Sequence, residues 1–169
     1  MKIVETERLI IQELTSEDAE FTLDLLNQPS FIKYIGDRNV RTLEEAENFL
    51  ETRYCQSYRD NGYGLYLVKL KSNNSKLGIC GFVKRENFQY ADIGFAFLPQ
   101  FEKQGYAVES ASAMMKYGEE ILGFKEVLAI TTQDNESSGR LLEKIGFNFD
   151  ELIKMPNGEV LKLFSWKID

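Results

Sequence analysis

The sequence predicts an α+β fold in which helices flank a mixed, mostly antiparallel sheet with one β-α-β crossover. Three apolar or β-branched runs, at 63–71, 77–85 and 90–98, follow one another with only turn residues between them, which is typical of an antiparallel meander. A long helical pattern then separates the run at 90–98 from another at 127–131. Since a strand, a helix and a strand in succession form a parallel pair, these last two runs predict the crossover.

The other expected elements are each bounded by cap or turn residues. They are a strand at 9–14, helices at 16–26, 30–35 and 42–61, a helix that begins at Asn135, and a hairpin of strands at 149–154 and 160–168. Ser16 is the expected N-cap of the first helix, and Thr42 with Glu45 fits a capping box for the third. The predicted order is therefore β-α-α-α-β-β-β-α-β-α-β-β.

The longest predicted helix begins near Gly105 and ends before Gly123. Apolar or small residues recur along it every three or four positions: Ala107, Ala111, Met114, Gly118 and Ile121. This spacing places them on one face of an α-helix.

Length and composition predict one globular domain that spans residues 1–169. No apolar run approaches the roughly 20 residues that a membrane span requires. The first residues, Met1–Arg8, lack the apolar core of a signal peptide, so we expect a cytoplasmic protein, either a monomer or a homodimer. The net charge of −7 disfavours a nucleic-acid partner and is compatible with a cationic substrate, although solubility alone also explains it.

The chain has no histidine and only two cysteines. The absence of histidine excludes Ser-His-Asp and Cys-His catalysis, and it leaves too few soft ligands for a zinc site, so no metal is expected. Cys55 and Cys80 are expected in or near the core, because cysteine is among the most buried residue types. A covalent acetyl-cysteine intermediate stays as the alternative.

One segment predicts an anion-binding turn. From Asp92 to Ser110 the chain has the pattern of a strand, a tight glycine turn and a long helix. Such a turn points backbone N–H groups and the positive end of the helix at one spot, as in pyrophosphate sites. The residues expected to supply these groups are Lys103, Gln104, Gly105, Tyr106 and Ala107. The alternative is that Gly105 is an ordinary turn glycine.

A second segment, Asn135–Phe147, predicts a capped helix that ends at a glycine. Asn135 and Ser138 form an Asn-x-x-Ser pattern at its start, and Lys144 lies near its end. Asn135 taken alone is explained as an N-cap, since Asn is preferred there. Ser138 taken alone is explained as a first-turn residue.

By their order and spacing, these two segments resemble the GNAT superfamily of N-acetyltransferases, in particular the branch of ribosomal-protein N-terminal alanine acetyltransferases. The resemblance covers nearly the whole chain. It departs from the family pattern at Glu102, where Gln or Arg is usual, and at Lys103, where glycine is frequent. It implies a GNAT-like fold, acetyl-CoA as cosubstrate, and direct attack of a primary amine on the acetyl group without an acyl-enzyme.

The resemblance also implies roles for individual residues. Asn135 would contact the pantetheine arm, and Lys144, in the same pattern, would also bind the cofactor. Ser138 would protonate or hydrogen-bond the departing thiolate. The strand Ala96-Phe97-Leu98 would splay from the strand at 127–130, which leaves backbone groups for the pantetheine amides. The Phe97 N–H would stabilise the tetrahedral oxyanion.

In some members of this superfamily a glutamate near this position is the general base, so the resemblance implies that role for Asp92. A base is needed because an amine is protonated at neutral pH and must lose a proton to attack. The alternative for Asp92 is an exposed strand aspartate. Glu109 is expected to play a structural role rather than a chemical one. Three aromatic residues either line an acceptor pocket or only pack in the core: Phe31, Tyr34 and Trp166.

Two other functions stay open from the sequence. One is a non-catalytic acyl-CoA-binding module on the same fold, and the other is an interaction protein that binds no CoA. For the enzyme, the acceptor is an amine, either a protein N-terminus or a small cationic amine.

Overall fold

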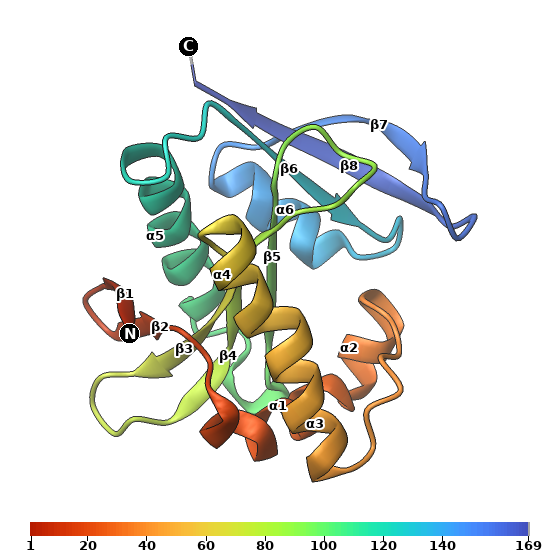
Figure 1. The fold of residues 1–169 in the computed structure, drawn as a ribbon. Coiled ribbons are helices and arrows are strands. Elements are labelled where there is room, and N and C mark those ends of the chain that lie inside the picture. Colours follow the sequence, from red (N-terminus) through yellow and green to blue (C-terminus); the bar gives the residue numbers. More distant parts are fainter. Residues whose placement is uncertain (169) are drawn as a thin grey trace.

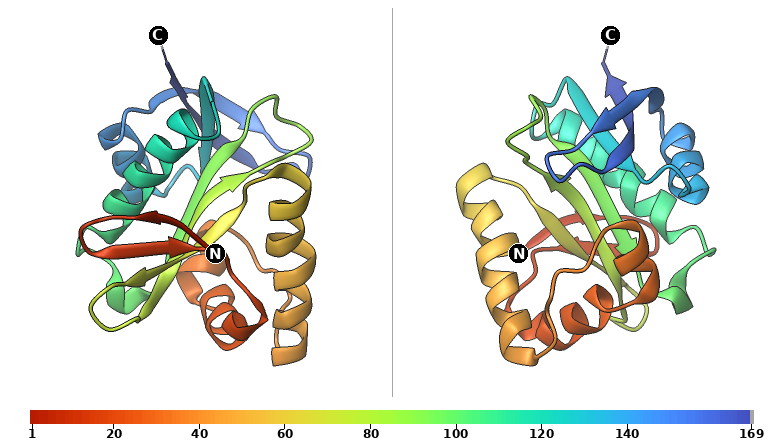
Figure 2. Two further views of the ribbon diagram at one scale, coloured as in Figure 1. Left: turned by 60° about the vertical axis from the view of Figure 1, so that its left-hand side comes forward. Right: turned by 90° about the vertical axis from the view of Figure 1, so that its right-hand side faces the viewer.

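The computed structural model describes residues 1–168, and its centre is an eight-stranded sheet with helices on both faces (Figures 1 and 2). The strand order is β1-β2-β3-β4-β5-β6-β8-β7. Only the β5–β6 pair is parallel among the described strands, and every other neighbouring pair is antiparallel. The predicted α+β class, with one crossover in a mostly antiparallel sheet, is therefore confirmed.

The strands are β1 (Lys2–Glu5), β2 (Leu9–Gln12), β3 (Leu65–Leu70), β4 (Lys76–Val83), β5 (Asp92–Phe97), β6 (Glu126–Thr131), β7 (Asn148–Lys154) and β8 (Val160–Lys167). The α-helices are α1 (Ala19–Leu26), α2 (Pro29–Tyr34), α3 (Leu43–Phe49), α4 (Gln56–Asn61), α5 (Tyr106–Glu120) and α6 (Glu136–Lys144). Short 3-10 turns are η1 (Ser16–Asp18) and η3 (Pro99–Phe101), and a π-helical stretch, η2 (Leu50–Cys55), joins α3 to α4. No helix in this described part is both long and apolar enough to span a bilayer.

Three local predictions need correction. The edge strand β1 was not predicted, because four residues with charged ends carry no clear alternation. The first helical segment is capped by Thr15 rather than Ser16, because Thr15 and Asp18 complete a reciprocal capping box. Ile121 does not belong to the buried face of α5, because the helix ends at Glu120 and leaves this side chain 69% exposed.

Two hydrophobic cores lie on opposite faces of the sheet. Helices α5 and α6 cover one face through Ala111, Met114 and Leu142, and the segment from α1 to η2 covers the other. Figure 2 shows α3 and α4 on one side of the strands and α5 on the other. Along β5 the side chains alternate: Ile93 and Phe97 belong to the first core, whereas Ala96 packs against the second.

The parallel strands β5 and β6 separate soon after they meet. Their register contains only the pair Asp92 and Leu128. Beyond it β5 stays paired with β4 as far as Phe97, and β6 stays paired with β8 as far as Thr131. The predicted splaying is therefore present, and it leaves a wedge-shaped gap in the middle of the sheet.

The edge of β5 that faces this gap can be assigned from two hydrogen bonds. The Leu98 N–H donates to the Leu77 carbonyl of β4, and the Leu128 N–H of β6 donates to the Ala91 carbonyl. Because successive residues of a strand direct their backbone groups to opposite edges, the N–H groups of Phe95 and Phe97 face the gap.

Candidate active site

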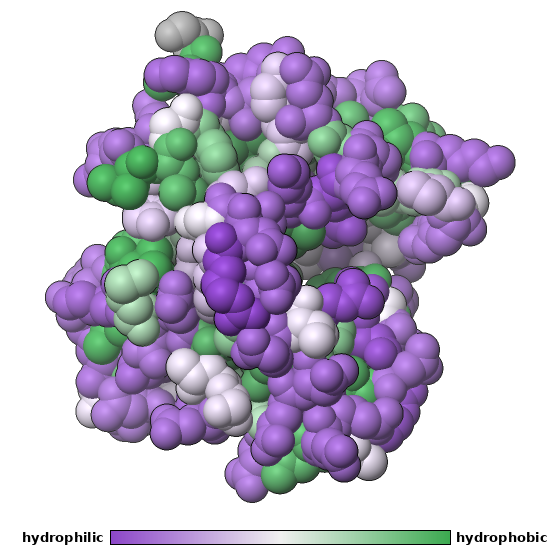
Figure 3. All heavy atoms as spheres, viewed as in Figure 1, coloured by the Kyte–Doolittle hydropathy of each residue, from purple (hydrophilic) through white to green (hydrophobic). Residues whose placement is uncertain are grey.

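A cavity of about 1930 Å³ surrounds the gap. Its wall includes Phe31 and Tyr54 from the α2–η2 side, and Gly105, Tyr106 and Ser138 from the α5–α6 side. Figure 3 shows the molecule hollowed between the region of α2 and the β7–β8 hairpin, which lie on either side of the opening. One cavity is therefore lined by residues from both faces of the sheet.

The turn before α5 has the geometry of an anion cradle. Lys103 and Gly105 adopt left-handed conformations, with φ of 61° and 83°. Within residues 1–168, the backbone N–H groups from Lys103 to Val108 donate to no protein acceptor, and the first backbone bond of the helix joins the Glu109 N–H to the Gly105 carbonyl at 3.0 Å. These free donors lie at the positive end of a 15-residue helix, which favours an anion.

The side chain of Arg8 holds this turn in place. Its Nε lies 2.7 Å from Glu109 Oε1, and its Nη1 donates to the Gln104 carbonyl at 3.0 Å. The guanidinium also lies over the Tyr106 ring, 4.5 Å from the centroid. Sequence reasoning missed Arg8, since it lies in the β1–β2 connection, far along the chain from the turn.

Glu109 is an anchor rather than a reacting group. Besides Arg8, it accepts a hydrogen bond from Thr6 Oγ1 at 2.6 Å. Burial acts to raise the pKa of Glu109, but the hydrogen bonds from Thr6 and Arg8 outweigh it and lower that pKa. The carboxylate is therefore held ionised, which agrees with the expected structural role.

At the start of α6, Asn135 is an N-cap. Its Oδ1 accepts the Ser138 N–H at 3.3 Å, which leaves the Nδ2 amide group for another partner. Ser138 is half-buried, and both residues line the cavity. Lys144, in the last turn of the helix, lines the cavity as well.

Two hydroxyl groups at the end of β6 complete this wall. Thr131 Oγ1 and Thr132 Oγ1 are buried and have no hydrogen-bond partner among residues 1–168, although both residues line the cavity. A buried polar atom of this kind is costly unless a ligand or water satisfies it. Sequence analysis did not single out these residues, because they appeared only as the end of a β-branched run.

Asp92 lies at the narrow end of the gap. It is 1% exposed, and its Oδ1 accepts a hydrogen bond from Arg85 Nε at 2.9 Å, so the alternative of an exposed strand aspartate is wrong. Burial raises the pKa of Asp92 to about 6, against the opposing effect of Arg85. At neutral pH it is a largely ionised carboxylate that can take up a proton near pH 6.

Asp92 and Phe97 are five residues apart on one strand, which corresponds to about 16 Å at 3.3 Å per residue. Asp92 therefore cannot touch an amine that reacts beside the Phe97 N–H. A chain of water molecules along the cavity would be needed to join them.

These features match a known family: the model of the acetyltransferase (GNAT) domain fits residues 8–148. The chain belongs to the GNAT family. This GNAT protein is 28% identical to the uncharacterized N-acetyltransferase YoaA of Bacillus subtilis (strain 168) over 153 aligned residues. The aligned part covers 90% of this chain and 86% of YoaA.

Solved GNAT structures share the whole fold. A GNAT-family acetyltransferase from Bacillus anthracis superposes with a TM-score of 0.80 at 27% identity, covering 99% of this chain and 98% of that one. RimL, a ribosomal L7/L12 α-N-protein acetyltransferase in complex with coenzyme A, gives a TM-score of 0.85 at 19% identity, covering 100% and 99%. The predicted membership of the GNAT superfamily is confirmed, and the fold is shared with a ribosomal-protein acetyltransferase.

The cysteines of this GNAT protein are poorly placed for acyl transfer. Burial raises the pKa of Cys80 to about 12, and burial also raises the pKa of the half-buried Cys55. Because the thiolate is the nucleophile, both thiols are weak ones. Among the described residues no cluster of three His, Cys, Asp or Glu side chains is arranged to hold a metal.

The other end of the cavity, near α2 and η2, is aromatic and basic. Of the three aromatic residues considered for an acceptor pocket, Phe31 and Tyr34 line this end of the cavity. Trp166 does not line it and packs instead near Gly146 in the first core. Arg38 and Arg53 also line this end. The net charge of −7 is compatible with a cationic substrate, but these arginines make this end of the cavity locally basic.

Proposed function

We propose that this GNAT protein transfers the acetyl group of acetyl-CoA to a primary amine by direct attack, with residues 1–169 acting as a single catalytic domain. The observation that carries the proposal is that one cavity joins two sets of unused backbone donors. One set lies in the Lys103–Val108 turn, and the other on the β5 edge at Phe95 and Phe97. Pyrophosphate and an amide-containing arm are the ligands that these two sets suit.

The chain offers a binding group for each part of acetyl-CoA. The N–H groups of Lys103, Gln104, Gly105, Tyr106 and Ala107 would hold the pyrophosphate. The open strand edge at Ala96-Phe97-Leu98 would pair with the pantetheine amides, and the free Nδ2 of Asn135 would add a donor. Lys144 would contribute positive charge at the rim.

Three groups would act on the reaction itself. The Phe97 N–H would stabilise the oxyanion that develops as the amine attacks the thioester carbon. Ser138 would donate a proton or hydrogen bond to the sulfur that leaves. Asp92 would receive the proton from the amine through water, because the strand spacing rules out direct contact.

The test is an amine and peptide panel with acetyl-CoA, followed by the release of free thiol. Thiol release that requires an amine, together with a melting shift on adding CoA, supports the enzyme. A melting shift without amine-dependent thiol release would instead favour the non-catalytic acyl-CoA-binding module. No shift at millimolar CoA would exclude both, since a ligand at 100 times its Kd adds about 2.7 kcal/mol.

A further inference from the structure

We propose that the acceptor amine carries a carboxylate, which Arg38 and Arg53 bind at the α2–η2 end of the cavity, with Arg85 beside them. This inference rests on the proposed function and specifies its substrate class. It makes the acceptor an anionic or zwitterionic amine rather than a polyamine.

Two of these guanidinium groups have no carboxylate partner. Within the described residues, neither Arg38 nor Arg53 forms a salt bridge, whereas Arg85 pairs with Asp92 at 2.9 Å. All three arginines line the cavity. Both arginines are exposed residues at the wall of an open cavity, and a carboxylate bound between them would pair with guanidinium groups that have no other anionic partner.

The arginines are also close enough to influence one another. Burial lowers the pKa of Arg38, and the positive charges of Arg85 and Arg53 lower it further, against the effect of Tyr54. Arg38 is an exposed residue, and it lines the same cavity as Arg53 and Arg85. The positive potential is therefore concentrated at one end of the cavity.

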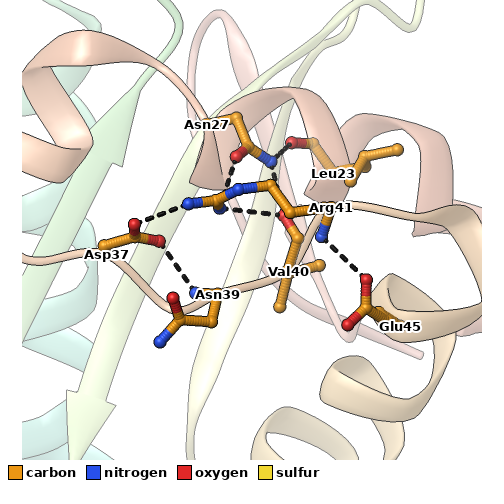
Figure 4. A network of polar contacts seen from close by, with 7 residues as sticks. All are labelled: Leu23, Asn27, Asp37, Asn39, Val40, Arg41 and Glu45. Carbon is orange, nitrogen blue, oxygen red and sulfur yellow. Dashed lines mark hydrogen bonds and ion pairs between the residues drawn. The ribbon is translucent and has the colours of Figure 1, made fainter.

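The loop that carries Arg38 is held by the network in Figure 4. Arg41 bridges Asp37 at 2.5 Å and Asn27 at 2.8 Å, and Asp37 also accepts the Asn39 N–H at 2.8 Å. Asn27 in turn donates to the Val40 carbonyl at 2.8 Å. The residues on both sides of Arg38 are thus fixed to the end of α1, while Arg38 itself takes no part in this network.

Arg53 is presented by the π-helical stretch η2. Its guanidinium carbon lies 5.9 Å from the centroid of the Phe49 ring, and its neighbour Tyr54 is buried. A π-helical turn shifts the register of the side chains on a helix face and is frequent at functional sites. Here it brings Phe49, Arg53 and Tyr54 onto the same cavity wall.

The carboxylates at this end do not cancel the arginines. Asp92 is paired with Arg85, and Asp60 keeps its charge but forms no salt bridge with Arg38 or Arg53 among the described residues; its Oδ1 accepts a hydrogen bond from Gln56. Glu86 lines the wall beside a further cation, Lys84. A carboxylate on the acceptor suits the remaining guanidinium groups, because the planar guanidinium fork matches it in geometry and charge.

Two kinds of acceptor supply this chemistry: a free amino acid through its α-carboxylate, and a peptide through an acidic side chain near its N-terminus. Matched pairs separate them. One arm compares an amino acid with its amide, and the other compares a peptide Ser-Asp-Ala-Ala-amide with Ser-Asn-Ala-Ala-amide. In each pair only the carboxylate changes.

For the source that is the substrate, we expect kcat/KM for the carboxylate form to exceed that of the amide by on the order of tenfold or more. The double variant Arg38→Gln/Arg53→Gln should bring the ratio close to one without changing the KM for acetyl-CoA. The control is Arg59→Gln, which removes an exposed arginine of α4 that pairs with Glu51 outside this wall. This control should keep the full ratio.

Equilibrium binding of the same pairs to the CoA-bound protein separates this inference from the proposed function. An arginine-dependent preference for the carboxylate form without any acetyl transfer would support the binding site and contradict the enzyme. Acetyl transfer with equal rates for both forms, or with a polyamine as the best acceptor, would overturn the carboxylate site and leave the enzyme. Loss of preference in Arg59→Gln as well would also overturn the assignment to Arg38 and Arg53.

Discussion

The guanidinium of Arg8 and the carboxylate of Glu109 meet at 2.7 Å, although the two residues are 101 positions apart in the sequence. The contact ties the β1–β2 connection to the first turn of α5. Because Arg8 also donates to the Gln104 carbonyl, it fixes the turn whose N–H groups are free. We infer that the N-terminal hairpin sets the position of the anion cradle.

Replacing Arg8 by Gln should weaken CoA binding on the order of tenfold, because the turn loses its charged hydrogen bonds. The free energy of unfolding should change little, by about 0–1 kcal/mol, because the Arg8 side chain is 41% exposed and its ion pair with Glu109 is only partly buried. Titration calorimetry with CoA and chemical unfolding measure the two effects. Arg59→Gln, which breaks the exposed pair with Glu51, is the control. Equal CoA affinity in wild type and Arg8→Gln would show that the tether does not position the cradle.

Gly105→Ala should weaken CoA binding more strongly than it destabilises the fold. The residue has φ of 83°, and a Cβ there would lie 3.2 Å from Arg8 Nη2, so the turn must shift or Arg8 must move. Gly123→Ala is a matched control, because its φ is 73° and no atom lies within 4 Å of the added Cβ. Both variants should lose about 1–2 kcal/mol from backbone strain. Only Gly105→Ala should raise the Kd for CoA, and equal Kd values in the two would place the cradle elsewhere.

Ser138→Ala should lower kcat by roughly 10²-fold and leave the KM for acetyl-CoA nearly unchanged, because its proposed role begins only as the thiolate departs. Steady-state kinetics with saturating acceptor gives both constants. Ser137→Ala, at the exposed neighbouring position, serves as the comparison. An unchanged kcat for Ser138→Ala would remove this residue from the mechanism.

The rate should depend on pH through Asp92. Only the ionised carboxylate can receive a proton, and its pKa is raised to about 6. The wild-type kcat/KM should therefore fall as pH drops through 6, and Asp92→Asn should be slower above pH 6 and lack this inflection. An identical inflection in Asp92→Asn would assign the titration to another group.

The same carboxyl group should affect stability in the opposite sense. In the unfolded chain its pKa is near the ordinary 3.8, and folding raises it to about 6, so the native state keeps the proton over a wider range. This contribution to stability is complete below pH 4 and is lost as pH rises to about 6, with an upper limit of about 3 kcal/mol. Urea unfolding of wild type and Asp92→Asn between pH 4 and 7 should show a difference that changes over this interval. A constant difference would mean that Asp92 does not titrate in the native state.

Most of the fold was predictable because its signals are local. The N-cap at Thr42, the left-handed end at Gly62 and the Asn135 cap each lie within a few residues of the helix end they define. The expected capping box at Thr42 is only half formed, because the Glu45 carboxylate accepts the Arg41 N–H instead of the Thr42 N–H. The sequence pattern predicts Ser16 as the cap, and Thr15 stands next to it. Only the spacing from Thr15 to Asp18 completes the reciprocal pair of hydrogen bonds.

The candidate site was predictable only in part, for a physical reason. The turn at Gly105 and the α6 start have sequence patterns, but Arg8 acts across 101 residues and carries no pattern of its own. The burial of Asp92 likewise depends on β4 and β6 as neighbours, and its pairing with Arg85 depends on the loop between β4 and β5. The positive cavity wall was not predicted, because the net charge of −7 is a sum over the whole chain and does not show where the arginines gather.

The separation of β5 from β6 has a thermodynamic consequence. A pantetheine arm lying along the free edge of β5 would take the place of a missing strand partner. The bound cosubstrate would then form part of the wall between the two ends of the cavity. Acceptor affinity is then coupled to CoA occupancy, and by reciprocity each ligand should tighten the binding of the other. If the arm binds this edge, we expect the CoA compound to bind before the amine, because it would complete the surface that the amine contacts.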